Sequence, residues 1–202
     1  MSELASFADH EDQRREDHIV VLRGATWRDY QRLREIRGDH SAPRLTYLEG
    51  TLEIMSPSQS HEAIKSIIGR LVEVWCLEHG VEFGTYGSWT LESEHHSRGA
   101  EPDECYVFGD VDAAERPDLA IEVVWTTGGI NKLEVYRKLG VREVWYWRRG
   151  RIQPYVLRAE RYHEVARSER FPELDIDQLA GFVERTPTSR AIREYRAALR
   201  GA

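Results

Sequence analysis

The sequence predicts an α/β (α+β) domain in which a mixed β-sheet is flanked by helices. Three observations predict this class. Helical and strand patterns of apolar residues alternate along most of the 202 residues. The stretch 119–125 is almost continuously apolar, which is typical of a strand buried on both faces. The chain is 41% hydrophobic and 31% charged, an ordinary composition for a domain with a core of its own.

The first part of the chain is expected to hold a helix, a hairpin and a long helix. The first helix covers 27–36, with Thr26 in position to cap it. The hairpin covers 44–54 and turns at Glu49-Gly50. The long helix follows a cap at Ser58 or Ser60 and ends at Gly80. Its apolar stripe is formed by Ile64, Ile67, Ile68, Leu71, Val74 and Trp75.

Strand patterns dominate the rest of the chain. The predicted strands are 81–86, 88–92, 105–108, 119–125, 141–147, 152–157 and 162–165. A polar loop covers 110–117, and a short helix between the Gly128-Gly129 turn and Gly140 follows the apolar strand. The tail from Ser189 has a helical pattern. We therefore expect a flexible leader at 1–18, one domain at 19–185 and a helical tail at 186–202.

Composition also narrows the cellular setting. No apolar stretch reaches the length of a membrane span, and the acidic start of the chain lacks the apolar centre of a signal peptide. We expect a cytoplasmic protein that does not contact a membrane. The two cysteines, Cys76 and Cys105, lack metal-type spacing and are expected to be buried, reduced thiols.

The charge of the chain is unevenly distributed. A net charge of −7 counts against a nucleic-acid partner, yet residues 132–170 carry eleven Lys and Arg against five Glu. This segment could form a basic face, or its arginines could simply coat solvated strands. Arg148, Arg149 and Arg151 are accordingly either phosphate contacts or solubilising residues of a turn.

Two carboxylates are predicted to meet at one end of the sheet. Glu122 interrupts an apolar strand, where a buried carboxylate is costly unless a cation or another partner compensates it. If the strand 105–108 returns antiparallel through the polar loop, Asp103 lies opposite Glu122, at about 5 Å. Carboxylates that close repel each other unless a cation lies between them. Magnesium, which binds oxygen ligands and keeps several waters, meets this requirement.

Lys132 brings a positive charge to the same strand end. It follows Glu122 by ten residues and starts the helix after Gly128-Gly129, from which it could reach back over the strand. Near a phosphate, its ammonium group could orient an attacking water or offset charge in the transition state. Alternatively, Lys132 forms a structural ion pair with Glu122. The residues alone leave both interpretations open.

The ordered set of motifs resembles the Uma-type restriction endonuclease family, which belongs to the PD-(D/E)XK nuclease superfamily. The resemblance covers about 24–182 and is carried by Leu48-Glu49-Gly50-Thr51-Leu52, Met55-Ser56-Pro57 with His61, Glu101-Pro102-Asp103, Pro117-Asp118-Leu119-Ala120-Ile121-Glu122-Val123, and Lys132 with Tyr136, Gly140, Val141, Glu143 and Trp145. The superfamily lysine usually stands two residues after the glutamate, where this chain has Val124. Lys132 fits a variant in which the lysine lies on the next helix.

The resemblance implies a restriction-endonuclease-like core and a magnesium-dependent endonuclease that hydrolyses phosphodiester bonds in DNA. It implies that Asp103, Glu122 and Lys132 are catalytic and that Asp103, Glu122 and the Val123 carbonyl bind Mg²⁺, or Mn²⁺ as a substitute. Glu49 and His61 are accessory candidates. A homodimer is expected by analogy with enzymes that cut both strands of a duplex. The alternative is a catalytically inactive nuclease-fold module that binds its partner elsewhere.

Overall fold

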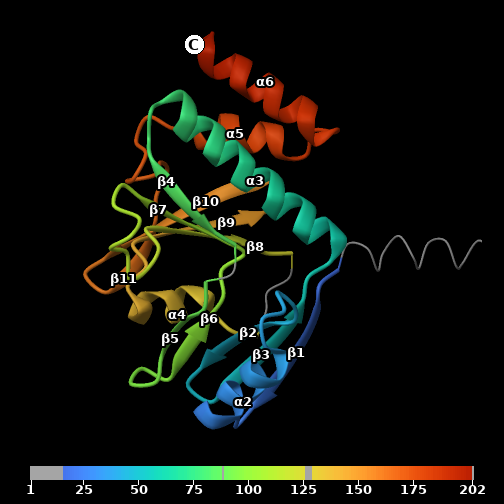
Figure 1. Ribbon diagram of the computed structural model, residues 1–202, viewed down its shortest axis with the longest axis vertical. Helices are drawn as coiled ribbons and strands as arrows, with labels where there is room; N and C mark the ends of the chain where they lie inside the picture. The colour runs from blue at the N-terminus through green and yellow to red at the C-terminus, as the bar shows by residue number, and fades with distance from the viewer. Residues whose placement is uncertain (1–15, 88, 126–128, 202) are drawn as a thin grey trace, which may run out of the picture.

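The structure is a computed structural model, and it describes residues 16–87, 89–125 and 129–201 (Figure 1). Residues 1–15 of the predicted leader and the first glycine of the Gly128-Gly129 turn lie outside the described residues. The described chain is an α+β fold, which confirms the predicted class. Its strands form two sheets rather than the one mixed sheet expected from the order of elements. No helix in the described ranges is long and apolar enough to cross a membrane.

The six-stranded sheet is mixed and has the order β11-β10-β9-β8-β7-β4. Its strands are β4 (Phe83–Tyr86), β7 (Glu104–Phe108), β8 (Leu119–Val123), β9 (Glu143–Arg148), β10 (Arg151–Arg158) and β11 (Arg161–Glu164). β8 and β9 are parallel, and all other neighbours are antiparallel. A parallel pair needs a crossover connection, which here contains helix α4 (Lys132–Leu139).

The five-stranded sheet is antiparallel and has the order β1-β3-β2-β6-β5. Its strands are β1 (His18–Arg23), β2 (Arg44–Leu48), β3 (Thr51–Ser56), β5 (Leu91–Ser93) and β6 (Arg98–Ala100). The chain leaves this sheet after β6 and enters the six-stranded sheet at β7, so residues 101–103 form the crossing between the sheets. Arg37 forms an ion pair with Glu101 and fixes this crossing. Asp103 is thereby placed at the junction of the two sheets.

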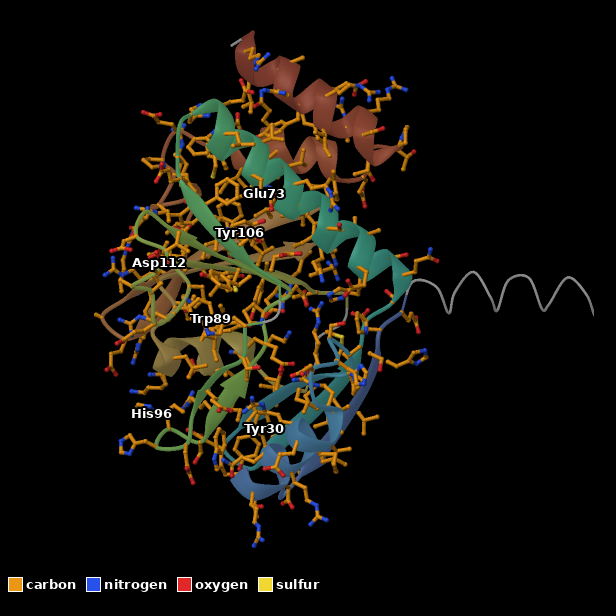
Figure 2. All side chains as sticks on the ribbon, viewed as in Figure 1. Tyr30, Glu73, Trp89, His96, Tyr106 and Asp112 are labelled. Atoms are coloured by element: carbon orange, nitrogen blue, oxygen red, sulfur yellow. The ribbon has the colours of Figure 1, made fainter. Side chains whose placement is uncertain are left out.

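Helices α3 (Gln59–Glu78) and α5 (Ile176–Val183) cover one face of the six-stranded sheet, and α6 (Thr188–Arg200) packs against these two helices (Figure 1). The Ser58 side chain caps α3 by accepting a hydrogen bond from the His61 amide. Figure 2 shows Tyr106 of β7 beneath Glu73 of α3, and the Tyr106 hydroxyl donates to Glu73 Oε1 at 3.3 Å. The residues of the apolar stripe predicted for the long helix all belong to the core on this side of the sheet or pack against it.

Helix α4 lies on the opposite face of the six-stranded sheet, between the two sheets (Figure 1). Side chains of a strand alternate between its faces. Leu119, Ile121 and Val123 belong to the core beneath α3, whereas Ala120 belongs to the core around α4. Glu122 shares the face of Ala120 and is fully buried, so this carboxylate points toward α4.

Helix α2 (Trp27–Arg37) packs on the five-stranded sheet and starts with a capping box formed by Thr26 and Asp29. Tyr30 is the buried residue of this helix and lies against Gly99 of β6. A β-carbon at position 99 would overlap the Tyr30 ring, so this close approach requires glycine. The contact fixes a three-residue strand that has no strand pattern of its own.

Candidate active site

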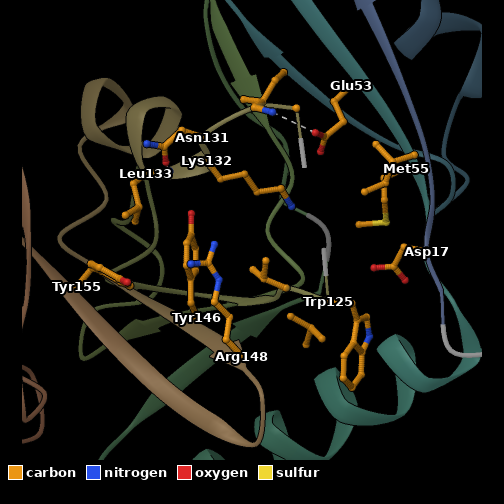
Figure 3. Close-up of a pocket in the computed structure, with 15 residues that line it drawn as sticks. Asp17, Glu53, Met55, Trp125, Asn131, Lys132, Leu133, Tyr146, Arg148 and Tyr155 are labelled. Carbon is orange, nitrogen blue, oxygen red and sulfur yellow. Dashed lines mark hydrogen bonds between the residues drawn. The ribbon is translucent and has the colours of Figure 1, made fainter. Parts of the chain in front are cut away.

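A cleft of about 440 Å³ opens between the two sheets, beside the carboxyl end of β8 and the start of α4 (Figure 3). Ligands of open α/β sheets bind outside the carboxyl ends of the strands, and this cleft has that position. Its walls carry four charged side chains, which are Asp17, Glu53, Lys132 and Arg148. The cleft is therefore suited to a ligand that bears charges of both signs.

Glu122 lies behind one wall of the cleft and is held by two residues of α4. Lys132 Nζ donates to Glu122 Oε2 at 2.6 Å, and the Tyr136 hydroxyl donates to Oε1. Lys132 and Tyr136 are one helical turn apart and share a face. Asn131 caps the helix by accepting from the Leu133 amide, which sets Lys132 as the first helical residue. Burial and the Glu122 charge raise the pKa of Tyr136 well above its ordinary value, so its hydroxyl remains a donor.

Asp103 is fully buried beside the same strand end. β7 and β8 pair Glu104 with Ile121, and the next step of this register places Asp103 opposite Glu122. Asp103 Oδ2 accepts a hydrogen bond from the Val123 amide at 2.6 Å, and Arg44 forms an ion pair with Oδ1. Asp103 and Glu122 thus approach one strand end, where each has its own cationic partner.

His61 connects Asp103 with the cleft. Its Nε2 lies 2.9 Å from Asp103 Oδ2, and its Nδ1 lies 2.8 Å from Asp17 Oδ2. The ring can donate a hydrogen bond to both carboxylates only when both of its nitrogens carry a proton. The second accessory candidate, Glu49, pairs with Arg98 at the β2–β3 turn and is not among the residues that line the cleft.

Asp17 and Glu53 line the cleft but were not predicted from the sequence. Glu53 could have been recognised from the sequence, because it is a single carboxylate in the apolar strand Leu52-Glu53-Ile54-Met55, as Glu122 is in its own strand. No sequence pattern indicates Asp17, since its partner His61 is 44 residues away and lies on another element.

The part of the chain that the structure describes contains no group of three or more His, Cys, Asp or Glu arranged to hold a metal ion. Any divalent cation in this cleft would therefore complete its coordination with main-chain oxygens, water or substrate. Mg²⁺ is commonly bound in this way, through one or two carboxylates and several waters.

The two-sheet α+β architecture, with paired acidic and basic groups at the end of a central strand, defines a restriction-endonuclease-like protein. The family model Uma2, described as "Putative restriction endonuclease", matches residues 27–188, and the chain belongs to this family. The match confirms the family resemblance carried by the motifs and supports a nuclease role. It includes Asp103, Glu122 and Lys132. A search of curated proteins found no match.

The contact between Asp17 and His61 should make the docking of β1 dependent on pH. Burial alone would raise the pKa of Asp17, but hydrogen bonds from His61 and the Ser58 amide outweigh burial and lower the pKa below its ordinary value. A carboxylate with a lowered folded-state pKa stabilises the fold above its unfolded-state pKa and loses this contribution as pH falls through the folded value. We expect amide protection in His18–Arg23 to fall as pH drops below about 4.

Hydrogen exchange, corrected for intrinsic rates, measures this protection. Asp17→Asn is the matched variant, and it should show lower protection of β1 at neutral pH and little further loss on acidification. Equal pH profiles for the two proteins would contradict a role for the Asp17 charge.

Proposed function

We propose that this protein is a magnesium-dependent endonuclease that hydrolyses phosphodiester bonds in DNA. The observation that carries the proposal is the buried Glu122 carboxylate at the end of β8, with Lys132 Nζ at 2.6 Å on the cleft side. A buried acid at a strand end and an ammonium group that lines a cleft are groups that metal-assisted phosphodiester hydrolysis can use, the acid as a cation ligand and the ammonium group to offset charge on the phosphate. Membership of the Uma2 family supports the same reaction class.

The donor set suits a hard cation. Asp103 and Glu122 offer carboxylate oxygens, and the Val123 carbonyl is a third oxygen donor in the proposed site. Mg²⁺, or Mn²⁺ in its place, would polarise a phosphate oxygen and acidify a water. Glu122 Oε2 is now bonded to Lys132, so cation binding and this ion pair compete for one oxygen. Loss of the ion pair would direct the Lys132 ammonium group into the cleft.

The remaining residues position these groups. Tyr136 fixes Glu122 through Oε1, so that the carboxylate keeps its place when Lys132 turns to the substrate. His61 and Arg44 fix Asp103 in the same way. In the proposed reaction Lys132 orients the attacking water and offsets the charge that develops on the phosphate.

The β9–β10 turn supports DNA as the substrate. β9 runs parallel to β8, so its turn lies at the same edge of the sheet as the cleft. Arg148 lines the cleft, and Arg149 and Arg151 are exposed on either side of Gly150. None of these three forms an ion pair within the described residues, which leaves them available to phosphates. We also propose a cytoplasmic homodimer, and the free, buried thiols of Cys76 and Cys105 agree with a reducing compartment.

Nicking of supercoiled plasmid DNA with Mg²⁺ tests the proposal. Glu122→Gln keeps the shape of the side chain but removes its charge, and we expect at least about a 10²-fold loss of nicking rate. Glu134→Gln on the exposed side of α4 is the control and should retain the rate of the unaltered protein. Equal rates for the unaltered protein and Glu122→Gln would remove the catalytic assignment.

The inactive-module alternative has its own support, because Lys132 and Tyr136 already satisfy both oxygens of Glu122. Titration calorimetry with Mg²⁺ and Mn²⁺ separates the two functions. Binding heat that disappears in Glu122→Gln supports the enzyme, and the absence of both heat and nicking supports the module.

A further inference from the structure

Glu53 differs from every other buried carboxylate that the structure describes. It is 3% exposed in the middle of β3, and its hydrogen bond is a long one, from the Ile130 amide to Oε2 at 3.3 Å. No Lys, Arg or His among the described residues pairs with it. Each of the other buried carboxylates has compensating partners. Arg37 pairs with Glu101, Arg44 with Asp103 and Lys132 with Glu122, and Glu143 accepts hydrogen bonds from three N–H donors at 2.6–3.1 Å.

Arg148, in the same cleft, is a positively charged residue without a negatively charged partner among the described residues. Its guanidinium group lies over the Tyr146 ring, 4.9 Å from the centroid, and has no carboxylate partner in the described ranges. The two other charged residues of the cleft wall are paired, Asp17 with His61 and Lys132 with Glu122. Among the described residues that line the cleft, the buried Glu53 carboxylate and the Arg148 guanidinium group are therefore the two charged groups without an ion-pair partner.

We propose that Glu53 binds a divalent cation, and that Arg148 binds the phosphate group that this cation carries. A buried carboxylate without a counter-charge is strongly unfavourable, and a cation delivered by the solvent supplies that charge. Mg²⁺ and Mn²⁺ bind through one or two carboxylates together with phosphate oxygens and waters, so one protein carboxylate is sufficient. Arg148 can hold a phosphate through paired N–H donors.

Figure 3 shows the geometry on which this assignment rests. Glu53 and Met55 project from β3 into the cleft, Lys132 reaches into it from α4, and Arg148 borders it from β9. A cation–phosphate unit placed in this space would meet the Glu53 carboxylate on one wall and the Arg148 guanidinium on another. The identity of the phosphate as part of DNA rests on the proposed function, whereas the cation site rests on the burial of Glu53.

Thermal unfolding and Mn²⁺ binding of Glu53→Gln test the cation site. Without divalent cations, removal of an uncompensated buried charge should raise Tm by about 2–4 °C. Glu143→Gln is the matched buried control, and it should lower Tm because the Glu143 carboxylate is well hydrogen-bonded. Mn²⁺ should raise the Tm of the unaltered protein, and its affinity, followed by the paramagnetic resonance of free Mn²⁺, should fall at least about tenfold in Glu53→Gln.

An Mn²⁺ affinity unchanged in Glu53→Gln overturns the proposal. Should that variant fold poorly, Glu53→Asp, which keeps the charge but withdraws the carboxylate, gives the same comparison of affinity. For Arg148, the probe is inorganic phosphate in the presence of Mn²⁺. Arg148→Met should lose phosphate binding and keep Mn²⁺ binding, and retained phosphate binding removes Arg148 from the site.

Plasmid nicking distinguishes failure of this site from failure of the enzyme. A protein that does not nick DNA, but whose Mn²⁺ affinity depends on Glu53, retains the cation site and loses the endonuclease function. A protein that nicks DNA, but binds Mn²⁺ independently of Glu53, retains the function and loses this site.

Discussion

Replacement of Lys132 by methionine is expected to lower the free energy of unfolding by about 3–5 kcal/mol. Methionine keeps an unbranched apolar stem but removes the ammonium group 2.6 Å from Glu122 Oε2. The side chains of Glu122 and Lys132 are 1% and 14% exposed, so water cannot compensate the remaining carboxylate. The Tyr136 hydroxyl still donates to Glu122, but a neutral donor offsets only part of a buried charge. Denaturant unfolding at constant pH measures the difference.

The double variant Glu122→Gln/Lys132→Met distinguishes the effect of an unpaired buried carboxylate on stability from the effect of lost packing. With both charges removed, the destabilisation should shrink to about 1 kcal/mol. Lys138→Met is the matched control on the same helix, because its partner Glu160 is 78% exposed. Exposed pairs contribute little to stability, because water screens both charges. Equal losses for the two single methionine variants would show that Glu122 does not depend on Lys132 for its charge balance.

Most helices and strands could be predicted because their signals are local. The Ser58 cap, the apolar stripe of α3 and the apolar run of β8 are all contained in short segments. The division into two sheets has no such signal. It depends on the pairing of β6 with β2 and on the Tyr30–Gly99 contact, which joins residues about seventy positions apart. Local patterns therefore predict the elements and leave their partners undetermined.

The candidate site divides in the same way. Glu122 and Lys132 could be associated from the sequence because a single strand-to-helix connection separates them. The contacts of Asp103 with Arg44 and His61 join segments that are 59 and 42 residues apart, and no periodicity indicates them. Glu53 was detectable as a charge in an apolar strand, but its unpaired state emerges only when its surroundings are known. The sequence does not show which positively charged groups lie around each buried carboxylate.

Replacement of Asp103 by alanine is expected to lower the free energy of unfolding by about 3–5 kcal/mol. This loss is larger than the loss of a cation ligand alone would cause. The change removes the acceptor of the Val123 amide and the partner of two buried groups, Arg44 and His61. The Arg44 side chain is 7% exposed and, within the described part of the chain, would keep only its contact with Glu62 at 2.9 Å. Denaturant unfolding measures the loss, with Asp177→Ala on the exposed first turn of α5 as the control, within about 0.5 kcal/mol of the unaltered protein.

Asp103→Asn then separates structure from chemistry. Asparagine keeps an oxygen for the Val123 amide, so its loss of stability should be smaller than that of Asp103→Ala, while the negative charge is absent from both. Cation binding and nicking should therefore be measured on the asparagine variant, at a temperature where it is folded. An alanine variant as stable as the Asp177→Ala control would mean that Arg44 and His61 find other partners, and Asp103 would no longer be the residue that joins the two sheets at this site.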